Sequence, residues 1–163
     1  VLVKTLRQMY AIDAGVKWPN DIMVGGKKLS GMLSELDTRA DMVAFVNIGL
    51  GINVNNDVAA VRPPAVSLKK ILGHRVSASH FLARFLDHLE VRLRAENYEH
   101  VIDEWKRYTV TLHRQVRIVT HHGQFEGLAV DVDATGALVL ALPDGSLQKV
   151  IYGDCFDAGP PGV

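Results

Sequence analysis

Apolar residues recur at helical spacing in three stretches of the chain, and this pattern predicts three helices. They cover residues 1–10, 79–95 and 98–108, and the first is expected to end near Gly15. A shorter helix is expected over residues 67–72, between a serine that can cap it and a glycine that can end it. The helix at 79–95 should bury one face, because its apolar residues fall at i, i+3, i+4 and i+7. That face carries Leu82, Phe85, Leu86, Leu89 and Leu93.

Three strands are predicted after the first helix. Residues 22–24 and 28–36 flank a glycine pair at 25–26. Two glycines between apolar segments indicate a tight hairpin, because both can adopt a positive φ. A polar turn at 37–41 then leads into residues 42–50, which are almost continuously apolar. Such a run is typical of a strand buried on both faces.

The pattern changes to a period of two beyond Thr111. Short alternating segments separated by turn residues are typical of a small β-barrel of the SH3-like kind. We therefore expect an α+β fold with two domains, residues 1–110 as a mixed sheet with packed helices and residues 111–163 as the barrel. The strands of the barrel are expected at residues 116–119, 124–130, 137–142 and 147–151.

Composition narrows the class of protein. Apolar residues make up 48% of the 163 residues, which is enough to bury a core. Lys+Arg and Asp+Glu balance at 18 each, so no overall field favours nucleic acid or an anionic membrane. No apolar run approaches the roughly 20 residues of a membrane-spanning helix. The single cysteine, Cys155, has no recognisable nucleophile context and fits a reducing compartment, so we expect a cytoplasmic protein.

The segment Lys17-Trp18-Pro19-Asn20-Asp21 is the first candidate for chemistry. Pro19 fixes its own φ and favours an extended conformation at Trp18, so the loop is stiff. A stiff loop that presents an amide and a carboxylate beside an indole suits a ligand. The same residues also suit an ordinary turn after a helix, with Trp18 buried in the core. The spacing alone leaves both interpretations open.

Two further segments are equally ambiguous. Lys28 is expected on a strand face shared with Ser30, Met32 and Ser34, where a lone lysine is usually a solvated charge. Gly31 within that strand often marks the close approach of a ligand or of another backbone. Residues 49–53, Gly-Leu-Gly-Ile-Asn, are either a glycine-softened strand end or a backbone close to a ligand. They are not a dinucleotide fingerprint, because no third glycine or helix follows.

Taken together, the three segments resemble the biotin protein ligase family. Their order and spacing are similar to that family's K-W-P-N-D, K-L-x-G-I-L-x-E and G-x-G-x-N blocks, and the C-terminal part resembles its small barrel. The resemblance implies a fold related to class II synthetases. It also implies ATP-dependent biotinylation of a lysine on a biotin carboxyl carrier domain, through biotinoyl-5′-adenylate. A lipoate ligase is the nearest enzymatic rival, and the first block disfavours it.

The resemblance also implies roles for individual residues. Lys28 would contact the carboxyl and α-phosphate oxygens, and Asp21 would orient the substrates or the incoming amine. A Mg²⁺ ion would accompany ATP, held largely by its phosphates. Met32 replaces the usual isoleucine, which is a volume-conserving change. The residues expected to bind substrate are Trp18, Asn20, Gly31, Met32, Gly49, Gly51 and Asn53.

The chain departs from the family in one respect. The Gly-Arg-rich loop that closes over the adenylate lies upstream of the first block, and residues 1–163 contain no G-R-G-x-x-G. Because the chain also begins at Val1 inside a predicted helix, we expect it to be part of a longer protein with little ligase activity by itself. The alternative is a non-catalytic module that binds a ligand or partner. Homodimers and DNA-binding domains occur in the family, but nothing in this segment indicates DNA binding.

Two segments resemble metal sites, but the residues present exclude both. Residues 131–136 begin like a calcium loop, but Thr135 and Leu142 stand where oxygen-rich ligands are needed. The histidine pair at 121–122 sits beside a glycine and is interpreted as a turn, because no paired Cys/His spacing typical of zinc occurs. No protein metal site is therefore predicted.

Overall fold

The computed structural model describes residues 1–39, 42–95 and 98–159, and the chain divides into two compact units. The first unit comprises Val1–Ala14 and Asn20–Ala95, and the second comprises Gly15–Pro19 and Glu96–Val163. The second unit thus includes Gly15–Pro19 and the segment from Glu96, which both lie before the boundary expected at residue 110. The helices of the described residues are too short or too polar to cross a membrane.

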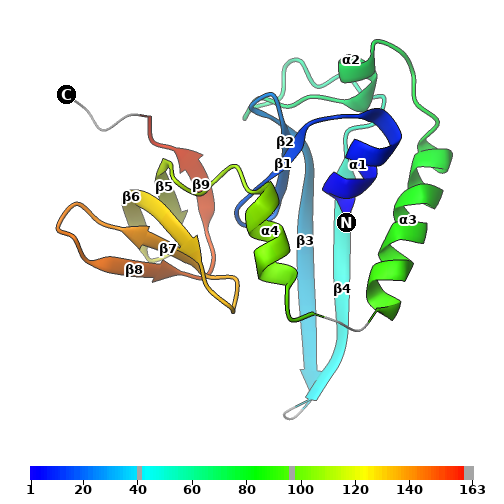
Figure 1. Ribbon diagram of the computed structural model, residues 1–163. Coiled ribbons are helices and arrows are strands. Elements are labelled where there is room, and N and C mark those ends of the chain that lie inside the picture. Colours follow the sequence, from blue (N-terminus) through cyan, green and yellow to red (C-terminus); the bar gives the residue numbers. More distant parts are fainter. Residues whose placement is uncertain (40–41, 96–97, 160–163) are drawn as a thin grey trace. The chain divides into compact units, whose positions relative to one another are not determined.

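The first unit contains three helices, α1 (Leu2–Tyr10), α2 (Leu68–Leu72) and α3 (Ala78–Arg94) (Figure 1). All three were predicted. Helix α1 ends sooner than expected, because Ala11 adopts the left-handed conformation with a φ of 52°. Helices α1 and α3 pack together, with the Tyr10 and Phe81 rings stacked 6.1 Å apart.

The buried face of α3 differs from the prediction. Phe81 and Phe85 are its buried residues. Leu82, Leu86 and Leu93 are about half exposed, so their predicted burial is wrong. Helical spacing identifies an apolar face, but burial also requires a neighbouring element. Within the described chain, α3 is covered mainly along the line of its two phenylalanines.

Three strands of the first unit form an antiparallel arrangement, β2 (Asp21–Val24), β3 (Lys27–Arg39) and β4 (Met42–Ile52). Gly25 and Gly26 connect β2 to β3 with φ values of 55° and 74°, which confirms the predicted hairpin. Strand β3 continues to Arg39, so the turn predicted from residue 37 begins later. Residues 40–41, also part of that prediction, lie outside the described residues.

Strands β3 and β4 run side by side as a long ribbon (Figure 1). The predicted burial of the 42–50 strand is wrong in this chain, since Phe45 and Ile48 are 55% and 58% exposed. Burial is confined to the other end of the ribbon. There Leu29 is fully buried; Leu6 of α1 and Leu68 of α2 are the other fully buried leucines of the first unit. This end also carries the candidate site.

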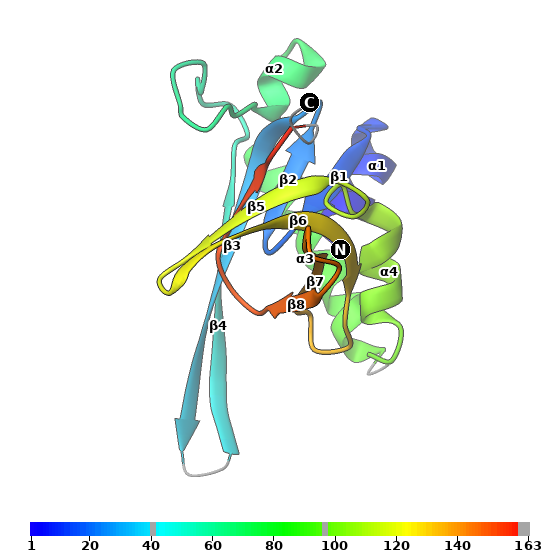
Figure 2. The same cartoon turned by 90° about the vertical axis from the view of Figure 1, so that its left-hand side faces the viewer.

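The second unit contains helix α4 (Val101–Tyr108) and a five-stranded antiparallel sheet in the order β8-β7-β6-β5-β9. Figure 2 shows β5 and β6 as a curved pair. The predicted α+β class is confirmed, and the four expected strands are present. The fifth strand, β9, was not predicted, and no pairing of β8 with β9 closes the sheet within the described residues. The strands are β5 (Gln115–Thr120), β6 (Gly123–Val132), β7 (Leu138–Ala141), β8 (Leu147–Val150) and β9 (Asp154–Asp157).

The early strand β1 (Ala14–Lys17) lies mostly in the second unit. Val16 forms a parallel bridge with Thr109, and the Val110 N–H donates to the Val16 carbonyl at 2.8 Å. The core of the unit is built from the inward residues of its sheet, with Ile118, Leu138 and Leu140 fully buried. A segment from the beginning of the chain is therefore part of the C-terminal unit.

Candidate functional site

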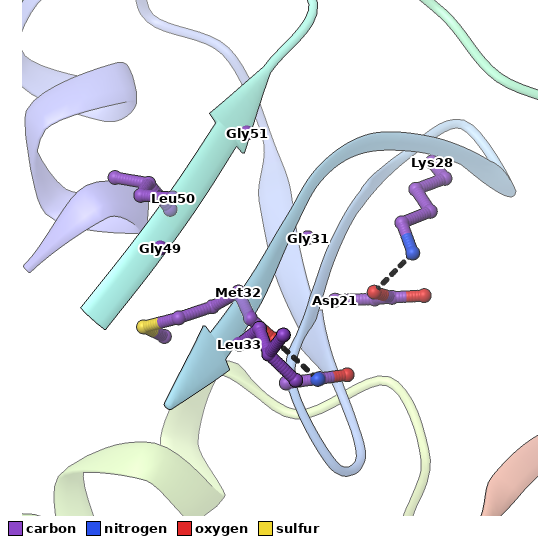
Figure 3. A pocket seen from close by; sticks show the side chains of 9 residues that line it. Asp21, Lys28, Gly31, Met32, Leu33, Gly49, Leu50 and Gly51 are labelled. Atoms are coloured by element: carbon purple, nitrogen blue, oxygen red, sulfur yellow. Dashed lines mark hydrogen bonds and ion pairs between the residues drawn. The ribbon is translucent and has the colours of Figure 1, made fainter. Parts of the chain in front are cut away.

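A pocket of about 480 Å³ lies in the first unit, where β2, β3 and β4 meet (Figure 3). It brings together every predicted site residue except Trp18 and Asn53. Its volume is within the range of sites for small organic ligands. The lining residues are Asn20, Asp21, Lys28, Gly31, Met32, Leu33, Gly49, Leu50 and Gly51.

Lys28 and Asp21 form an ion pair at the edge of the pocket. The distance from Lys28 Nζ to Asp21 Oδ1 is 2.6 Å (Figure 3). The two side chains are 38% and 22% exposed, so the ammonium remains accessible to a ligand. A fixed cation beside a carboxylate can stabilise negative charge that develops on a bound substrate.

A shift in strand register brings these two residues to one face. Asp21 pairs with Gly31 and Ile22 with Ser30, but Met23 pairs with Lys28, so Leu29 is the extra residue. Such an irregularity moves the following side chain to the other face of the strand. Lys28 therefore lies with Asp21 and Gly31, and its predicted placement with Ser30, Met32 and Ser34 is wrong. Strict alternation cannot anticipate an inserted residue.

The backbone of Lys28 is fixed from the other side by the loop after β4. Its N–H donates to the Pro64 carbonyl at 3.0 Å, and its carbonyl accepts from the Val66 N–H at 2.9 Å. Leu29 is held similarly, since its carbonyl accepts from the Asn53 N–H at 2.9 Å. These bonds fix the origin of the lysine side chain, so only the side-chain torsions remain to be ordered when a ligand binds.

Gly31 provides the room for the ion pair. A Cβ at this position would lie 2.9 Å from both Cε and Nζ of Lys28 and 3.2 Å from Oδ1 of Asp21. The close approach predicted from the sequence is therefore to the side chains of the site. Gly49 and Gly51 are less crowded, because a Cβ there would meet its nearest atoms at 3.7 Å and 3.9 Å.

Asn20 fastens the loop before Asp21 to β3. Its side-chain Nδ2 donates to the Met32 carbonyl, and its own carbonyl accepts from the Met32 N–H at 3.0 Å. Figure 3 shows the first of these bonds below Leu33. Asn20 thus occupies both backbone groups of one residue. Asn20 therefore lines the pocket, and its two hydrogen bonds to Met32 also keep the neighbouring Asp21 paired with β3.

The remaining two predicted site residues lie elsewhere. Trp18 is 3% exposed in the core of the second unit, and its Nε1 donates to the Gly136 carbonyl at 3.1 Å. Asn53 directs its Nδ2 towards the Lys28 carbonyl at 3.5 Å, and its Oδ1 accepts from Asn56 at 2.9 Å. In this structure both side chains stabilise protein groups and do not line the pocket.

Sequence reasoning missed two kinds of residue. Leu33 and Leu50 line the pocket although neither was singled out, and their positions beside the glycines were the available signal. Ser30 is 2% exposed and donates through Oγ to the Gly51 carbonyl at 2.7 Å, which joins β3 to β4 behind the site. A buried hydroxyl of this kind has no signature in a single sequence.

The donor set at the site does not resemble a protein metal cage. Across the described part of the chain, no group of three or more His, Cys, Asp or Glu side chains is arranged to hold a metal ion. Among the described residues, Asp21 is the one carboxylate that lines the pocket, and it already faces Lys28.

Two family models match the chain. Residues 1–53 match the biotin/lipoate A/B protein ligase family, and residues 111–156 match the biotin protein ligase C-terminal domain. The first match contains the pocket, and the second contains the sheet of the second unit.

Individual relatives of this chain are also biotin ligases. The chain is 31% identical over 160 residues to the bifunctional ligase/repressor BirA of Bacillus subtilis, covering 94% of this chain and 49% of that protein. It is 33% identical over 132 residues to the biotin–[acetyl-CoA-carboxylase] ligase of Mycobacterium tuberculosis, covering 78% and 47%. The chain thus spans about half the length of these curated relatives.

Solved structures agree in fold. The apo biotin protein ligase of Aquifex aeolicus has a TM-score of 0.82 at 22% identity, covering 96% of this chain and 71% of that one. The same enzyme in complex with biotin and ATP has a TM-score of 0.77 at 21% identity, covering 95% and 66%. At this identity the likeness concerns the fold alone.

Proposed function

Because this chain belongs to the biotin protein ligase family, we propose that its pocket is part of an active site for ATP-dependent biotinylation of a carrier-protein lysine. The observation that carries the proposal is the ammonium of Lys28, held 2.6 Å from Asp21 beside a glycine-lined strand pair. The reaction has two steps, and negative charge develops on oxygen in both.

In the first step, a carboxylate oxygen of biotin attacks the α-phosphorus of ATP, and pyrophosphate leaves. The product is biotinoyl-5′-adenylate. Lys28 stabilises the negative charge on the carboxylate and α-phosphoryl oxygens. Its fixed backbone limits the reorganisation needed when the charge develops.

In the second step, the amine of the carrier lysine attacks the acyl carbonyl, and AMP leaves. The carbonyl oxygen becomes an oxyanion that Lys28 can again stabilise. Asp21 accepts a hydrogen bond from the incoming amine and orients it towards the carbonyl. The ion pair therefore serves both steps, with Lys28 turned to the substrate oxygens and Asp21 to the amine.

The remaining lining residues suit the rest of the ligand. Met32, Leu33 and Leu50 supply apolar surface for the hydrocarbon and thioether parts of biotin. Gly49 and Gly51 allow the ligand to approach the backbone of β4. Asn20 acts by fastening the loop, and Asn53 by supporting the Lys28 carbonyl.

Magnesium belongs to this proposal only as a companion of ATP. The described residues offer one pocket carboxylate, so the ion would be held mainly by the phosphates. When bound, it would neutralise phosphate charge and favour departure of pyrophosphate.

The partner in this proposal is the biotin carboxyl carrier domain of a carboxylase. We place the protein in the cytoplasm, because a sequence with a single cysteine, Cys155, contains no internal disulfide, which suits a reducing compartment. A homodimer formed through the apolar β3–β4 ribbon is a further expectation, since an exposed strand of this kind tends to pair with another chain.

The test uses the intact protein with biotin, ATP and a carrier domain. Pyrophosphate exchange measures the first step, and biotin incorporation into the carrier measures the whole reaction. We expect Lys28→Met to lower both by about 100-fold or more, as loss of a charge-stabilising group does. Lys27→Met, at the exposed neighbouring position, is the matched control and should retain the wild-type rate.

Two outcomes would contradict the proposal. A wild-type protein that binds biotin but shows no biotin-dependent pyrophosphate exchange would be a non-catalytic binding module. Equal rates for Lys28→Met and Lys27→Met would remove Lys28 from the chemistry.

A further inference from the structure

We propose that the surface around α2 is a docking surface for an acidic region of the carrier protein. The inference rests on the proposed function and adds to it the place where the protein substrate makes contact. The surface, called here the α2 basic surface, consists of four residues of the first unit: Arg62 before the helix, Lys69 and Lys70 within it, and Arg75 after it.

The charge balance around α2 differs from that of the whole chain. Residues 58–86 contain five Lys and Arg residues and no Asp or Glu, in a chain whose formal net charge is zero. All four residues of the α2 basic surface are exposed. A local excess of one sign in a neutral protein produces a field that is confined to that part of the surface, because salt screens it over about 8–10 Å.

The charges of the α2 basic surface are also not neutralised by neighbouring side chains. Elsewhere in the first unit, Arg7, Arg84 and Arg94 each lie within 3.2 Å of a carboxylate oxygen. Among the described residues, no ion pair joins a carboxylate to any member of the α2 basic surface. Its cations are therefore available to a partner.

The α2 basic surface flanks the pocket. The Lys28 N–H donates to the Pro64 carbonyl at 3.0 Å, and the Val66 N–H donates to the Lys28 carbonyl at 2.9 Å. Arg62 precedes this bonded segment by two residues, and Lys69 follows it by three. Since neighbouring Cα atoms are about 3.8 Å apart, cations lie close to both ends of the segment that holds Lys28.

Hydrogen bonds fix the backbone that carries these cations. The Lys69 N–H donates to the Val54 carbonyl at 2.8 Å, next to the end of β4. Beyond the helix, the Asn55 side chain exchanges two hydrogen bonds with the backbone of Val76, at 2.7 Å and 2.9 Å. A partner that binds the α2 basic surface therefore does not have to order this segment, which lowers the cost of association.

Electrostatics indicates the chemistry of the partner. The carrier lysine approaches the pocket as an ammonium, which a basic surface repels. The approach is favourable when acidic side chains surround that lysine on the carrier and meet the α2 basic surface. Residues 58–80 contain no Phe, Tyr or Trp on which the bases of a single strand could stack, which favours a protein over a nucleic acid as the occupant.

The experiment on the intact protein separates docking from chemistry. Pyrophosphate exchange does not require the carrier, whereas biotin transfer gives the KM for a carrier domain. We expect Lys69→Glu combined with Lys70→Glu to raise this KM about tenfold at low ionic strength, since each exposed charge contributes modestly. The difference from the wild type should shrink at high salt, because exposed charges are screened. Pyrophosphate exchange should keep its wild-type rate.

Arg75→Glu and Arg39→Glu are a matched pair of single variants. Both replace an exposed arginine of the first unit by glutamate, but Arg39 is the last residue of β3, at the far end of the ribbon from α2 (Figure 1). Arg75→Glu should raise the KM for the carrier, and Arg39→Glu should not. Lys69→Gln combined with Lys70→Gln removes the charges without reversing them and should give an intermediate KM.

Three outcomes would overturn the inference. The first is an unchanged KM for the carrier in the double glutamate variant, and the second is an equal rise in KM for Arg75→Glu and Arg39→Glu. The third is a loss of pyrophosphate exchange as large as the loss of biotin transfer, because the cations would then act on the nucleotide.

Two further measurements separate the remaining possibilities. A short single-stranded DNA that binds the wild type but not the double glutamate variant, with the KM for the carrier unchanged, would assign the surface to nucleic acid and overturn the inference. Absence of pyrophosphate exchange in the wild type would contradict the proposed function instead. Fluorescence anisotropy of a labelled carrier domain, titrated with the wild type and the double glutamate variant, would still decide whether the α2 basic surface docks it.

Discussion

The Cα of Asp21 lies opposite that of Gly31 on the neighbouring strand, and the missing side chain of Gly31 leaves the space in which the Asp21 carboxylate meets Lys28. Lys28 reaches this space because the register of β2 and β3 shifts by one residue at Leu29. The ion pair thus depends on one inserted residue and on one absent Cβ. Neither feature is part of the chemistry, but together they decide where the ammonium lies.

Gly31→Ala should displace the Lys28 ammonium. The added Cβ would lie 2.9 Å from Nζ, and the flexible end of the lysine would move rather than the backbone. We expect a folded protein with biotinylation lowered about 10- to 100-fold, since small misplacements of a catalytic group have effects of this size. The ¹⁵N shift of the Lys28 ammonium, measured by NMR without ligand, should change.

Gly51→Ala is the comparison for this prediction. It changes the opposite position on β4, where the nearest atom to a Cβ would be 3.9 Å away. Its effect on the Lys28 ammonium shift should be small even if the ligand binds less well. An unchanged ¹⁵N shift of the Lys28 ammonium in Gly31→Ala would show that the added Cβ does not displace this group.

Asn20→Asp should disturb the loop more than Asn20→Ala. The amide Nδ2 donates to the Met32 carbonyl, and a carboxylate in its place would set two acceptors against each other. Asn20→Ala removes the bond without adding repulsion, and its cost should be about 1 kcal/mol. Denaturant unfolding measures the difference in stability. A more stable Asn20→Asp than Asn20→Ala would show that the bond to Met32 does not hold the loop.

Much of the fold could be predicted from local pattern. The glycine pair at 25–26 and the helix that stops at Gly73 follow from conformations that glycine adopts easily, and such signals act within a few residues. The pocket residues were identified because three short segments have a recognisable order and spacing. That pattern names residue types, and the pocket indeed contains most of them.

The residues whose positions were predicted wrongly owe those positions to contacts between residues that are far apart in the sequence. The indole of Trp18 is buried by residues about a hundred positions later, which no local pattern reveals. The orientation of Lys28 required a register shift that alternation does not predict. Exposure of Phe45 and Leu82 depends on which elements cover them, and an apolar pattern shows only a tendency to be covered.

Acid should weaken the second unit through two aspartates. The pKa of Asp131 is lowered mainly by a hydrogen bond from Lys106. Hydrogen bonds from Lys149 and Thr135 hold the pKa of Asp133 well below its usual range. A carboxylate with a lowered pKa in the folded state stabilises the fold above its ordinary pKa of about 3.9. That stabilisation is lost as the pH falls below this value towards the folded-state pKa.

The measurement is Tm against pH, followed by fluorescence of Trp18 and Trp105, which both lie in the second unit. Asp133→Asn should lower Tm at pH 7 and flatten the fall in Tm between pH 5 and 2. Lys149→Met removes the partner of Asp133 and should flatten the profile in the same direction. Profiles parallel to that of the wild type would show that the bonds of Asp133 contribute no pH-dependent stability.

The β3–β4 ribbon should bind an apolar dye. Leu36, Val46 and Ile48 are each more than half exposed. Leu36 lies opposite Val46, and Ile48 lies two residues further along β4, so the three side chains share one face of the ribbon and form a continuous apolar surface. The 163-residue chain should therefore enhance 8-anilinonaphthalene-1-sulfonate fluorescence while folded. Val46→Ser combined with Ile48→Thr should remove most of the enhancement. The pair should change the free energy of unfolding by less than about 1 kcal/mol, because both side chains are exposed.

Leu147→Ser, at a 68% exposed position of the second unit, is the control and should leave the dye signal intact. Equal dye binding by the double variant and the wild type would mean that the dye binds elsewhere.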